Sequence, residues 1–556
     1  MINLLKNIWY RPILLEQLKT YNRNLFFKDL LSGIIVGVVA LPLGIAFGIA
    51  SGVTPEKGII SCIIAGFFCS LLGGSKFQIS GPTGALIVIV SGVIGQFGLE
   101  GLFIATFISG IFLLLMGIFK VGSIIKFIPY PIVIGFTSGI AVTIFSTQIK
   151  DFFGLNITTV PTGFIQKWGV YFNSIDSINI YAVITAIATI LLIRAFIKIS
   201  PRIPSFLTTI VIISAANYVL RYHFGINLIQ TIGDKFIIDA SLPSAQDLGI
   251  TFDKVKSLFS AGLTIAIFGA IVTLLSSTVA DGLKSESHNP NTELVGQGVA
   301  NMISPIFGGI PVTGAIARTI TNISNGGRTP IAGIIHAIVL LLILLLLGNL
   351  SQHIPMACLA GILVLISYNM SDWRTFVSLL RMPRADVVVL VTTFLLTVIF
   401  DLTIAIEVGL LLAVISFVRR TSEASSVSVI THKTDLTQSS IVDEDVIDVP
   451  KNIEIYEIEG PFFFGVANKF NDVKKHLGTI KTHTRIIRMR KVPFIDSTGI
   501  HNLEILYKNS KNEKVNIILS GVNPSVLDSL TKSGFTNLIG ENNIFPDINS
   551  ALSSLK

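Results

Sequence analysis

Two short peptides in matching surroundings constrain the fold of this chain more than any other feature. They are Ser80–Ala85 and Pro311–Ala315, and each follows a double glycine, Gly73-Gly74 or Gly308-Gly309. Each interrupts an apolar stretch and opens a short segment rich in small residues. Matched interruptions in two halves of a membrane region are typical of inverted-repeat transporters, whose broken helices meet near the bilayer midplane. We therefore expect two half-helices whose N-termini face each other.

The composition indicates a membrane protein with a soluble appendage. The 556 residues are 51% hydrophobic and only 13% charged, whereas soluble proteins average about 25% charged residues. Taking about 20 residues per span, we expect about fourteen apolar helices between residues 30 and 418. The third (82–97) and the tenth (312–324) are too short to cross alone, and they begin with the paired peptides. The net charge of +8 lies mostly beside the spans, so we expect no nucleic-acid partner.

The basic residues also predict an orientation. Residues 1–28 carry no evident cleavable signal, so the first apolar segment is read as a retained span. With a cytoplasmic N-terminus, the inside loops carry most of the cations: Lys76, Lys120, Lys126, Arg194, Lys198, Arg202, Lys284, Arg328, Arg374, Arg381 and Arg384. This distribution follows the positive-inside rule. We therefore expect the chain to lie in the inner (cytoplasmic) membrane, with both termini in the cytoplasm.

The composition changes abruptly after Arg420. Residues 421–450 are rich in Ser, Thr and Asp and are read as a linker. Beyond them, strands are predicted at 453–458, 485–489 and 515–519, with helices at 467–477 and 499–509. The expected domains are a cytoplasmic segment (1–28), a transmembrane domain (29–420, repeats about 29–221 and 257–420), the linker, and an α/β domain (451–556).

Several motifs in order then carry a resemblance. They are Leu41–Gly48, Gly81–Gly84, Gly296–Gly298 with Asn301, Ala315–Thr319, Asp401–Gly409 and, near the C-terminus, Asp496-Ser-Thr-Gly499. Together they resemble the SulP (sulfate permease) family of anion transporters, and the last motif resembles a cytoplasmic STAS domain.

The resemblance implies two inverted repeats of about seven helices each, arranged as a core and a gate domain. It implies an anion held between helices three and ten, an elevator-like movement of the core, and a homodimer. The STAS domain implies a further cytoplasmic protein partner.

The chemistry of the paired peptides agrees with an anion site. A helix N-terminus presents unpaired amides and roughly +0.5 of a charge, which favours anions. The predicted substrate-binding residues are Phe47, Ser80, Gly81, Thr83, Gly84, Ala85, Thr313, Gly314, Ala315 and Arg318. The alternatives are that the small residues only permit tight helix packing, that Phe47 is a plain core aromatic, and that Arg318 reaches the cytoplasmic surface.

The eighth helix departs from the family pattern. Bacterial relatives often carry a carboxylate there, whereas this chain has Val272 within Gly269–Leu275. The remaining coupling candidates are Thr273, Ser276 and Glu407, the last of which is also explained by a structural role. Cation coupling by this route is therefore in doubt, and anion exchange or uniport is favoured.

No catalytic triad, P-loop or metal-ligand cluster is evident, so we expect a transporter that is not an enzyme and needs no cofactor or metal. The favoured function is transport of small inorganic anions such as sulfate or bicarbonate. The alternatives are transport of organic anions such as C4-dicarboxylates, and a membrane-anchored STAS signalling scaffold. Ser497 and Thr498 lie at the loop that is phosphorylated in STAS relatives, although an Asp-Ser-Thr helix cap without regulation is the favoured explanation.

Overall fold

A computed structural model describes residues 10–123, 129–157, 159–161, 163–199, 204–225, 229–236, 241–400, 402–430, 450, 452–466 and 482–555. The side chains of residues 402, 403, 406, 407, 410, 429 and 430 are outside this description. The chain divides into two compact units, Met1–Leu410 and Leu411–Lys556.

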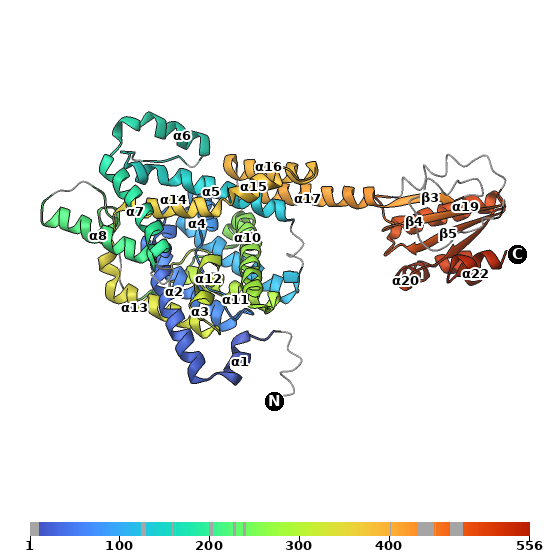
Figure 1. Cartoon of the computed structure of the whole chain (residues 1–556), viewed down its shortest axis with the longest axis horizontal. Helices are drawn as coiled ribbons and strands as arrows, with labels where there is room; N and C mark the ends of the chain where they lie inside the picture. Colours follow the sequence, from blue (N-terminus) through green and yellow to red (C-terminus); the bar gives the residue numbers. More distant parts are fainter. Residues whose placement is uncertain are drawn as a thin grey trace. The chain divides into compact units, whose positions relative to one another are not determined.

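The first unit is built from helices, as the long apolar segments predict (Figure 1). Its first half contains α1 (Ile13–Gln17), α2 (Arg23–Ala50), α3 (Pro55–Leu72), α4 (Gly84–Ile118), α5 (Tyr130–Phe153), α6 (Phe164–Asn173), α7 (Ile180–Ile199), α8 (Ser205–Tyr222) and α9 (Ile232–Lys235). Its second half contains α10 (Phe252–Lys284), α11 (Pro290–Ile303), α12 (Ile316–Ser324), α13 (Ile331–Leu347), α14 (Met356–Met370), α15 (Trp373–Leu379) and α16 (Arg384–Ile399). The helix α17 (Leu402–Ala424) begins in the first unit and ends in the second.

The predicted third and fourth apolar segments are the two parts of α4. They are separated at Gly98, whose φ of 71° lies in the left-handed region that glycine tolerates best. Among the described residues, nine helices are long and apolar enough to cross a membrane unaided. The 9-residue α12 is too short, in agreement with the half-helix predicted at this place.

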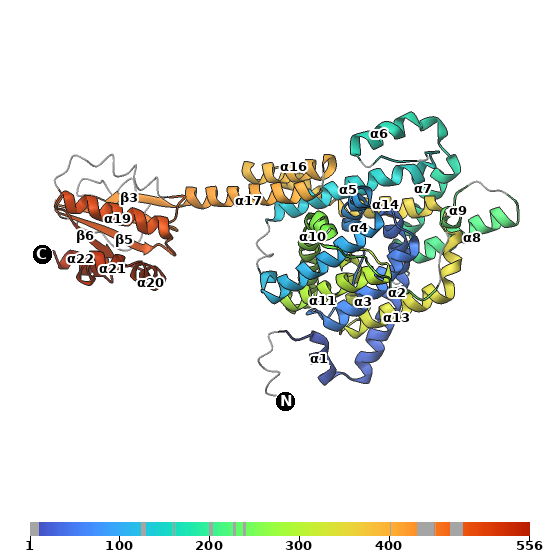
Figure 2. The ribbon, with the colours of Figure 1, turned by 180° about the vertical axis from the view of Figure 1, so that it is seen from behind.

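The helices of the first unit pack in two groups (Figure 2). The core group comprises α2, α3, α4 and α10–α13, and the gate group comprises α5, α7, α8, α14 and α16. Small residues bring the core helices close together: Gly58 of α3 lies against the Gly44 carbonyl of α2, and Gly110 of α4 against that of Gly298 in α11.

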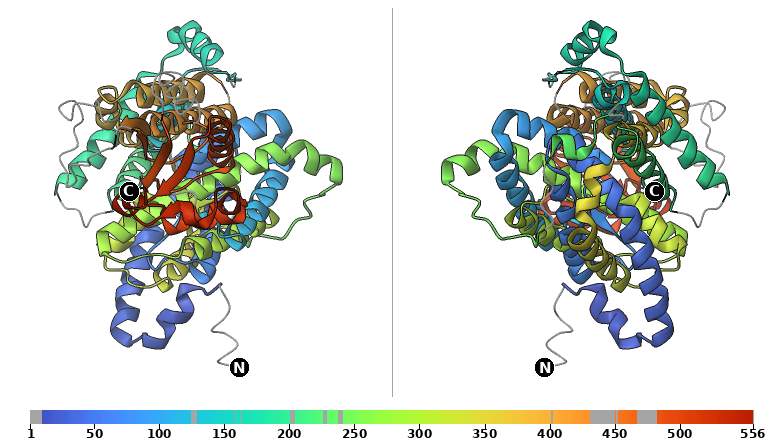
Figure 3. Two further views of the ribbon diagram at one scale, coloured as in Figure 1. Left: turned by 90° about the vertical axis from the view of Figure 1, so that its right-hand side faces the viewer. Right: turned by 90° about the vertical axis from the view of Figure 1, so that its left-hand side faces the viewer.

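The second unit contains a five-stranded sheet in the order β3-β4-β5-β6-β7. Red arrows of this sheet are visible in the left panel of Figure 3. The strands are β3 (Ser426–Ile430), β4 (Ile453–Glu459), β5 (Thr484–Lys491), β6 (Asn516–Ser520) and β7 (Ile544–Phe545). Only the β3–β4 pair is antiparallel. The apolar core on one face includes α19 (Ser497–Asn512) and α20 (Pro524–Lys532), and that on the other includes α22 (Ile548–Ser553).

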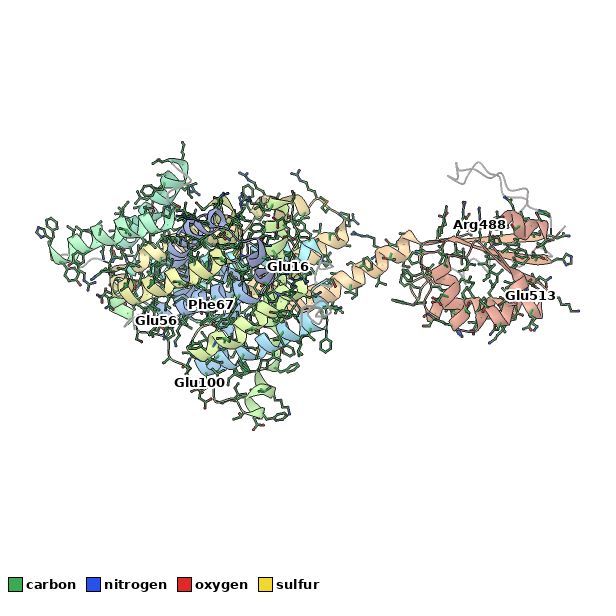
Figure 4. The ribbon with its side chains drawn as sticks, turned by 90° about the horizontal axis from the view of Figure 1, so that it is seen from below. Glu16, Glu56, Phe67, Glu100, Arg488 and Glu513 are labelled. Atoms are coloured by element: carbon green, nitrogen blue, oxygen red, sulfur yellow. The ribbon has the colours of Figure 1, made fainter. Side chains whose placement is uncertain are left out.

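Ion pairs tie β4 to β5 within this sheet. Arg485 contacts Glu454 at 3.2 Å and Glu513 at 2.7 Å, and Arg488 contacts Glu457 at 3.5 Å. Figure 4 labels Arg488 and Glu513 among the side chains of this unit. Glu454 and Glu457 of β4 are buried, so each needs its cationic partner.

The start of the second unit differs from the prediction. The linker predicted over 421–450 is wrong at its start, because α17 continues to Ala424 and β3 pairs along β4 from Ser426 to Ile430. The alternating Ser and Val of β3 is a strand pattern, but its serines suggested a linker. The predicted helix at 467–477 and most of the linker lie outside the described residues.

Candidate functional site

The two interrupting peptides form a short antiparallel sheet inside the first unit. The strand β1 (Ser80–Gly81) pairs with β2 (Thr313–Gly314), so that Ser80 faces Gly314 and Gly81 faces Thr313. An antiparallel pair relates its strands by a local two-fold axis. This is the relationship that an inverted repeat requires at its centre.

Each strand leads directly into a half-helix. The first part of α4 begins at Gly84 after Thr83, and α12 begins at Ile316 after Ala315. The side-chain oxygens of Thr83 and Thr313 are 3.1 Å apart, within hydrogen-bond distance. The two helix starts are thereby held next to one another.

Both half-helix N-termini keep free donors. Neither N-cap residue caps its helix through a side chain. Within the described ranges, the amides of Gly84 and Ala85 in α4, and of Ile316 and Ala317 in α12, donate to no protein acceptor. Converging amides at two helix starts favour a negatively charged ligand.

Apolar side chains border the start of α4. A Cβ placed on Gly84 would lie 3.4 Å from Ile144 Cδ1, 3.6 Å from Phe47 Cε1 and 3.7 Å from Met370 Sδ. Phe47 itself is buried on α2, whereas the other two residues belong to α5 and α14 of the gate group. A polar helix tip beside apolar walls has few competing waters, which strengthens its interaction with charge.

Arg318 is a buried residue that hydrogen-bonds to the peptide preceding α4. Its side chain is only 2% exposed, so it does not reach a surface. Its Nη2 donates to the Pro82 carbonyl, and its Nη1 donates to Cys62 Sγ at 3.2 Å. A Cβ on Gly81 would overlap Nη1, so a larger residue at that position would displace the guanidinium. The guanidinium thus holds the peptide that leads into α4 and places a positive charge beside it.

The helix α10 ties down the other peptide. Thr273 Oγ1 accepts from the Gly314 amide at 3.0 Å, and Gln78 Nε2 donates to the Thr273 carbonyl at 3.2 Å. Ser276 Oγ lies 3.4 Å from Thr319 Oγ1, which also accepts from the Ile79 amide. Two of the three coupling candidates, Thr273 and Ser276, are therefore buried and already engaged in holding the two peptides.

Two amides on α11 complete the frame. Gln297 Nε2 and Asn301 Nδ2 both donate to the Val312 carbonyl, at 2.7 and 2.9 Å, and Asn301 Oδ1 accepts from the Val312 amide at 2.9 Å. Gln297 Oε1 also accepts from Ser80 Oγ at 3.2 Å. The hydroxyl of Ser80 is thus directed at α11.

The structure brings most of the predicted binding residues into one place, and the coupling candidate Thr273 contacts Gly314 there. Gly81, Thr83, Gly84, Ala85, Thr313, Gly314, Ala315 and Arg318 surround the two helix starts, with Phe47 beside them. Val272 is half-buried and packs against the apolar core. The side chain of Glu407, and Asp401 as a whole, lie outside the described part of the chain.

Gln297, Asn301 and Thr319 lie in motifs that carry the family resemblance, but neither they nor Gln78 were predicted to hold the two peptides. A signal existed for two of them, because Gln297 and Asn301 are four residues apart inside an apolar helix and so share a face. Nothing comparable pointed to Gln78, whose importance comes from contacts with residues far away in sequence.

The STAS loop contains a complete helix cap. Asp496 Oδ1 accepts from the Gly499 amide at 2.8 Å, and its Oδ2 accepts from the Phe464 amide at 3.1 Å. Ser497 begins α19 and is exposed, whereas Thr498 is half-buried. Among the described residues of both units, no cluster of His, Cys, Asp and Glu has the makeup of a metal site.

Sequence comparisons agree with this architecture. A sequence model of the sulfate permease family matches residues 26–393, and a STAS domain model matches residues 446–551. YvdB of Bacillus subtilis, by name a candidate sulfate transporter, is 40% identical over 528 residues, covering 95% of this chain and 97% of YvdB. The bicarbonate transporter BicA of Picosynechococcus is 28% identical over 507 residues, covering 89% of this chain and 88% of BicA.

Solved structures show the same fold. The transmembrane domain of a cyanobacterial BicA aligns with a TM-score of 0.61 at 32% identity, covering 71% of this chain and 98% of that domain. The murine anion transporter Slc26a9 in its inward-facing state aligns with a TM-score of 0.84 at 19% identity, covering 97% and 93%. The predicted fold class, a helical membrane transporter with a C-terminal STAS domain, is confirmed.

Proposed function

The chain belongs to the sulfate permease family of anion transporters, and from this premise we propose that it carries small inorganic anions across the cytoplasmic membrane as a secondary transporter. The observation that carries the proposal is the meeting of two uncapped helix starts, joined by the Thr83–Thr313 contact. Sulfate and bicarbonate are the leading substrates, because the relatives that this chain resembles over most of its length carry these anions in their names.

The residues at the helix starts supply what a dehydrated anion needs. Free amides of Gly84, Ala85, Ile316 and Ala317 would replace part of its water shell, and the threonine hydroxyls would add a further donor. Arg318 adds positive potential beside the site, while two of its N–H groups donate to the Pro82 carbonyl and Cys62 Sγ. Such a fixed arrangement binds an anion without having to reorganise.

We propose that the core group moves relative to the gate group as an elevator. Both half-helices belong to the core group and are tied to α10 and α11, so the anion site would travel as a rigid piece. Ile144 and Met370 of the gate group lie beside Gly84 and would be exchanged for other neighbours during the movement. We further propose cytoplasmic termini, from the positive-inside pattern, and a homodimer, from the family resemblance.

The decisive experiment is uptake into proteoliposomes that contain the purified chain. Labelled sulfate, bicarbonate, chloride and succinate are compared, each with and without sodium and pH gradients. The proposal would be supported by saturable uptake of a labelled inorganic anion, if unlabelled anion inside the vesicles accelerates that uptake. Uptake of succinate alone would favour organic anions, and the absence of uptake for every anion would favour the signalling scaffold. An anion current that flows without alternating access of the site to the two sides of the membrane would indicate a channel.

A further inference from the structure

The double glycines that precede the two half-helices leave room for polar side chains. A Cβ on Gly73 would lie 2.8 Å from Glu293 Oε2, and a Cβ on Gly309 would lie 2.9 Å from Ser61 Oγ. Both separations are shorter than a carbon–oxygen van der Waals contact, and glycine permits so close an approach to its backbone. Each double glycine therefore receives a side chain from a helix of the other repeat.

Glu293 lies beside the first double glycine. It belongs to the first turn of α11 and is only 1% exposed. Its Oε2 accepts from the Gly74 amide at 2.7 Å and from the Ser75 amide at 2.9 Å. No Lys, Arg or His in the described ranges lies within ion-pair distance of this carboxylate. Hydrogen bonds to an ionised acceptor are roughly twice as strong as neutral ones, so the two amides are held firmly.

The carbonyls of the same turn are also occupied. The Ile13 amide donates to the Gly73 carbonyl at 3.1 Å, and the Asn289 amide donates to the Gly74 carbonyl at 3.1 Å. The turn is therefore fixed by the segment that precedes α2 as well as by the start of α11. From this turn the chain runs through residues 76–79 into β1.

Ser61 makes the corresponding contact in the second repeat. It is fully buried on α3, and its Oγ accepts from the Ile310 amide at 2.7 Å while donating to the Lys57 carbonyl at 2.6 Å. The helices α3 and α11 pack against each other in the core group (Figure 2). Each of them leads into a double glycine and holds the turn that follows the double glycine of the other repeat.

We propose that Glu293 is a positioning residue for anion binding, because it fixes the turn at Gly74 and Ser75. This inference rests on the proposed function. The turn sets the direction in which the chain enters β1 and then α4, so a displaced turn moves the helix-start amides that would receive the anion. Ser61 acts in the same way on β2, through a neutral and weaker hydrogen bond. The carboxylate thus holds the α4 tip more firmly than the hydroxyl holds the α12 tip.

Equilibrium binding of labelled sulfate to the purified full chain can test this role, since it gives both Kd and the number of sites per protein. Glu293→Ala should raise Kd at least about tenfold and leave the number of sites unchanged. Glu293→Gln keeps an oxygen that can accept the two amides, so its Kd should return to within about threefold of the wild type. Ser61→Ala should raise Kd about threefold. A merely structural role would lower the number of sites and leave Kd unchanged.

Glu286→Gln is the matched control. Glu286 pairs with Lys76 of the same peptide at 2.5 Å, but both side chains are partly exposed. Surface ion pairs contribute little, so this variant should change Kd less than about twofold.

Hydrogen exchange of the same variants needs no bound anion. In Glu293→Ala, the amides of residues 76–86 should exchange at least about fivefold faster, while those of α13 keep their wild-type rates. Equal Kd in Glu293→Ala and wild type, or equal exchange over 76–86, overturns the positioning role. If the wild type binds no sulfate, the proposed function fails for this anion, and hydrogen exchange alone then decides whether Glu293 fixes the turn.

Discussion

The side-chain oxygens of Thr83 and Thr313 lie 3.1 Å apart, although 230 residues separate them in the sequence. Thr83 directly precedes the start of α4, and Thr313 lies three residues before the start of α12. One hydroxyl of the pair must donate to the other, so the second keeps a proton for another acceptor. The Thr313 hydroxyl also lies 3.4 Å from the Gly314 carbonyl, so the pair links the two repeats and leaves the Thr83 hydroxyl free to donate to an anion when Thr313 donates to Thr83.

Removing one hydroxyl of this pair should weaken anion binding more than it weakens the fold. We expect Thr313→Val to raise the KM for sulfate uptake roughly tenfold, since a hydrogen bond to a charged group contributes about 1.5–3 kcal/mol. The β1–β2 pairing involves backbone only and should survive. The measurement is initial uptake into proteoliposomes, with thermal unfolding of the same preparations.

Thr321→Val is the matched control, because the Thr321 hydroxyl bonds only within α12, to the Ala317 carbonyl at 2.8 Å. Its KM should equal that of the wild type. The same KM in Thr313→Val would show that the threonine pair is not part of the anion site.

Arg318 should be essential through its position as well as its charge. We expect Arg318→Ala to lower kcat/KM at least about tenfold, because the Pro82 carbonyl loses its buried partner, a loss that costs about 1–3 kcal/mol. Arg318→Lys keeps the charge but cannot span two acceptors, so its activity should be intermediate. Uptake assays on both variants measure this.

Arg328→Ala supplies the comparison for Arg318, since the Arg328 side chain is exposed beyond the end of α12. It should transport as the wild type does. Wild-type rates in Arg318→Ala would remove this residue from any role in transport.

The positions of the helix breaks could be predicted from the sequence, but the framework around them could not. The double glycines and Pro82 mark the interruptions locally, and residue pattern alone locates them. Strands of two residues have no recognisable periodicity, so the pairing of β1 with β2 has no sequence signal. The orientation of Arg318 toward Pro82 and Cys62 likewise depends on contacts across the fold.

The STAS strands were predictable for a different reason. The strand β6 contains a run of aliphatic residues, and β4 repeats Ile among Glu and Tyr. Both patterns indicate strands that are bounded by turn residues. The edge strand β3 alternates Ser and Val, and its polar half is typical of a linker as well as of an exposed edge. Local pattern cannot distinguish a linker from an exposed edge strand, because β3 is a strand only through its pairing with β4.

The pair formed by Asp234 and Arg221 should make stability depend on pH in acid. The guanidinium lowers the pKa of Asp234 from 3.8 to about 2, so the stabilisation is fully present above about pH 4 and is lost as the pH falls toward 2. We expect Asp234→Asn to lower Tm by roughly 1–3 °C at pH 7, with the difference from wild type shrinking below pH 4. Thermal scans of the full chain from pH 7 to pH 3 measure it.

Asp176→Asn controls for the loss of a negative charge, because Asp176 is exposed and forms no ion pair among the described residues. It should leave Tm unchanged at every pH. A difference for Asp234→Asn that persists undiminished at pH 3 would contradict the assigned pairing.

Transport should show little dependence on sodium. Val272 offers no oxygen ligand, while Thr273 already accepts from the Gly314 amide and Ser276 is engaged with Thr319. Replacing sodium with choline should change initial sulfate uptake less than about twofold, because a hard cation needs several oxygen ligands that these groups do not supply. Unlabelled sulfate inside the vesicles should accelerate uptake if the protein exchanges anions. A steep sodium requirement would mean that a cation site exists elsewhere, with Glu407 the first residue to substitute.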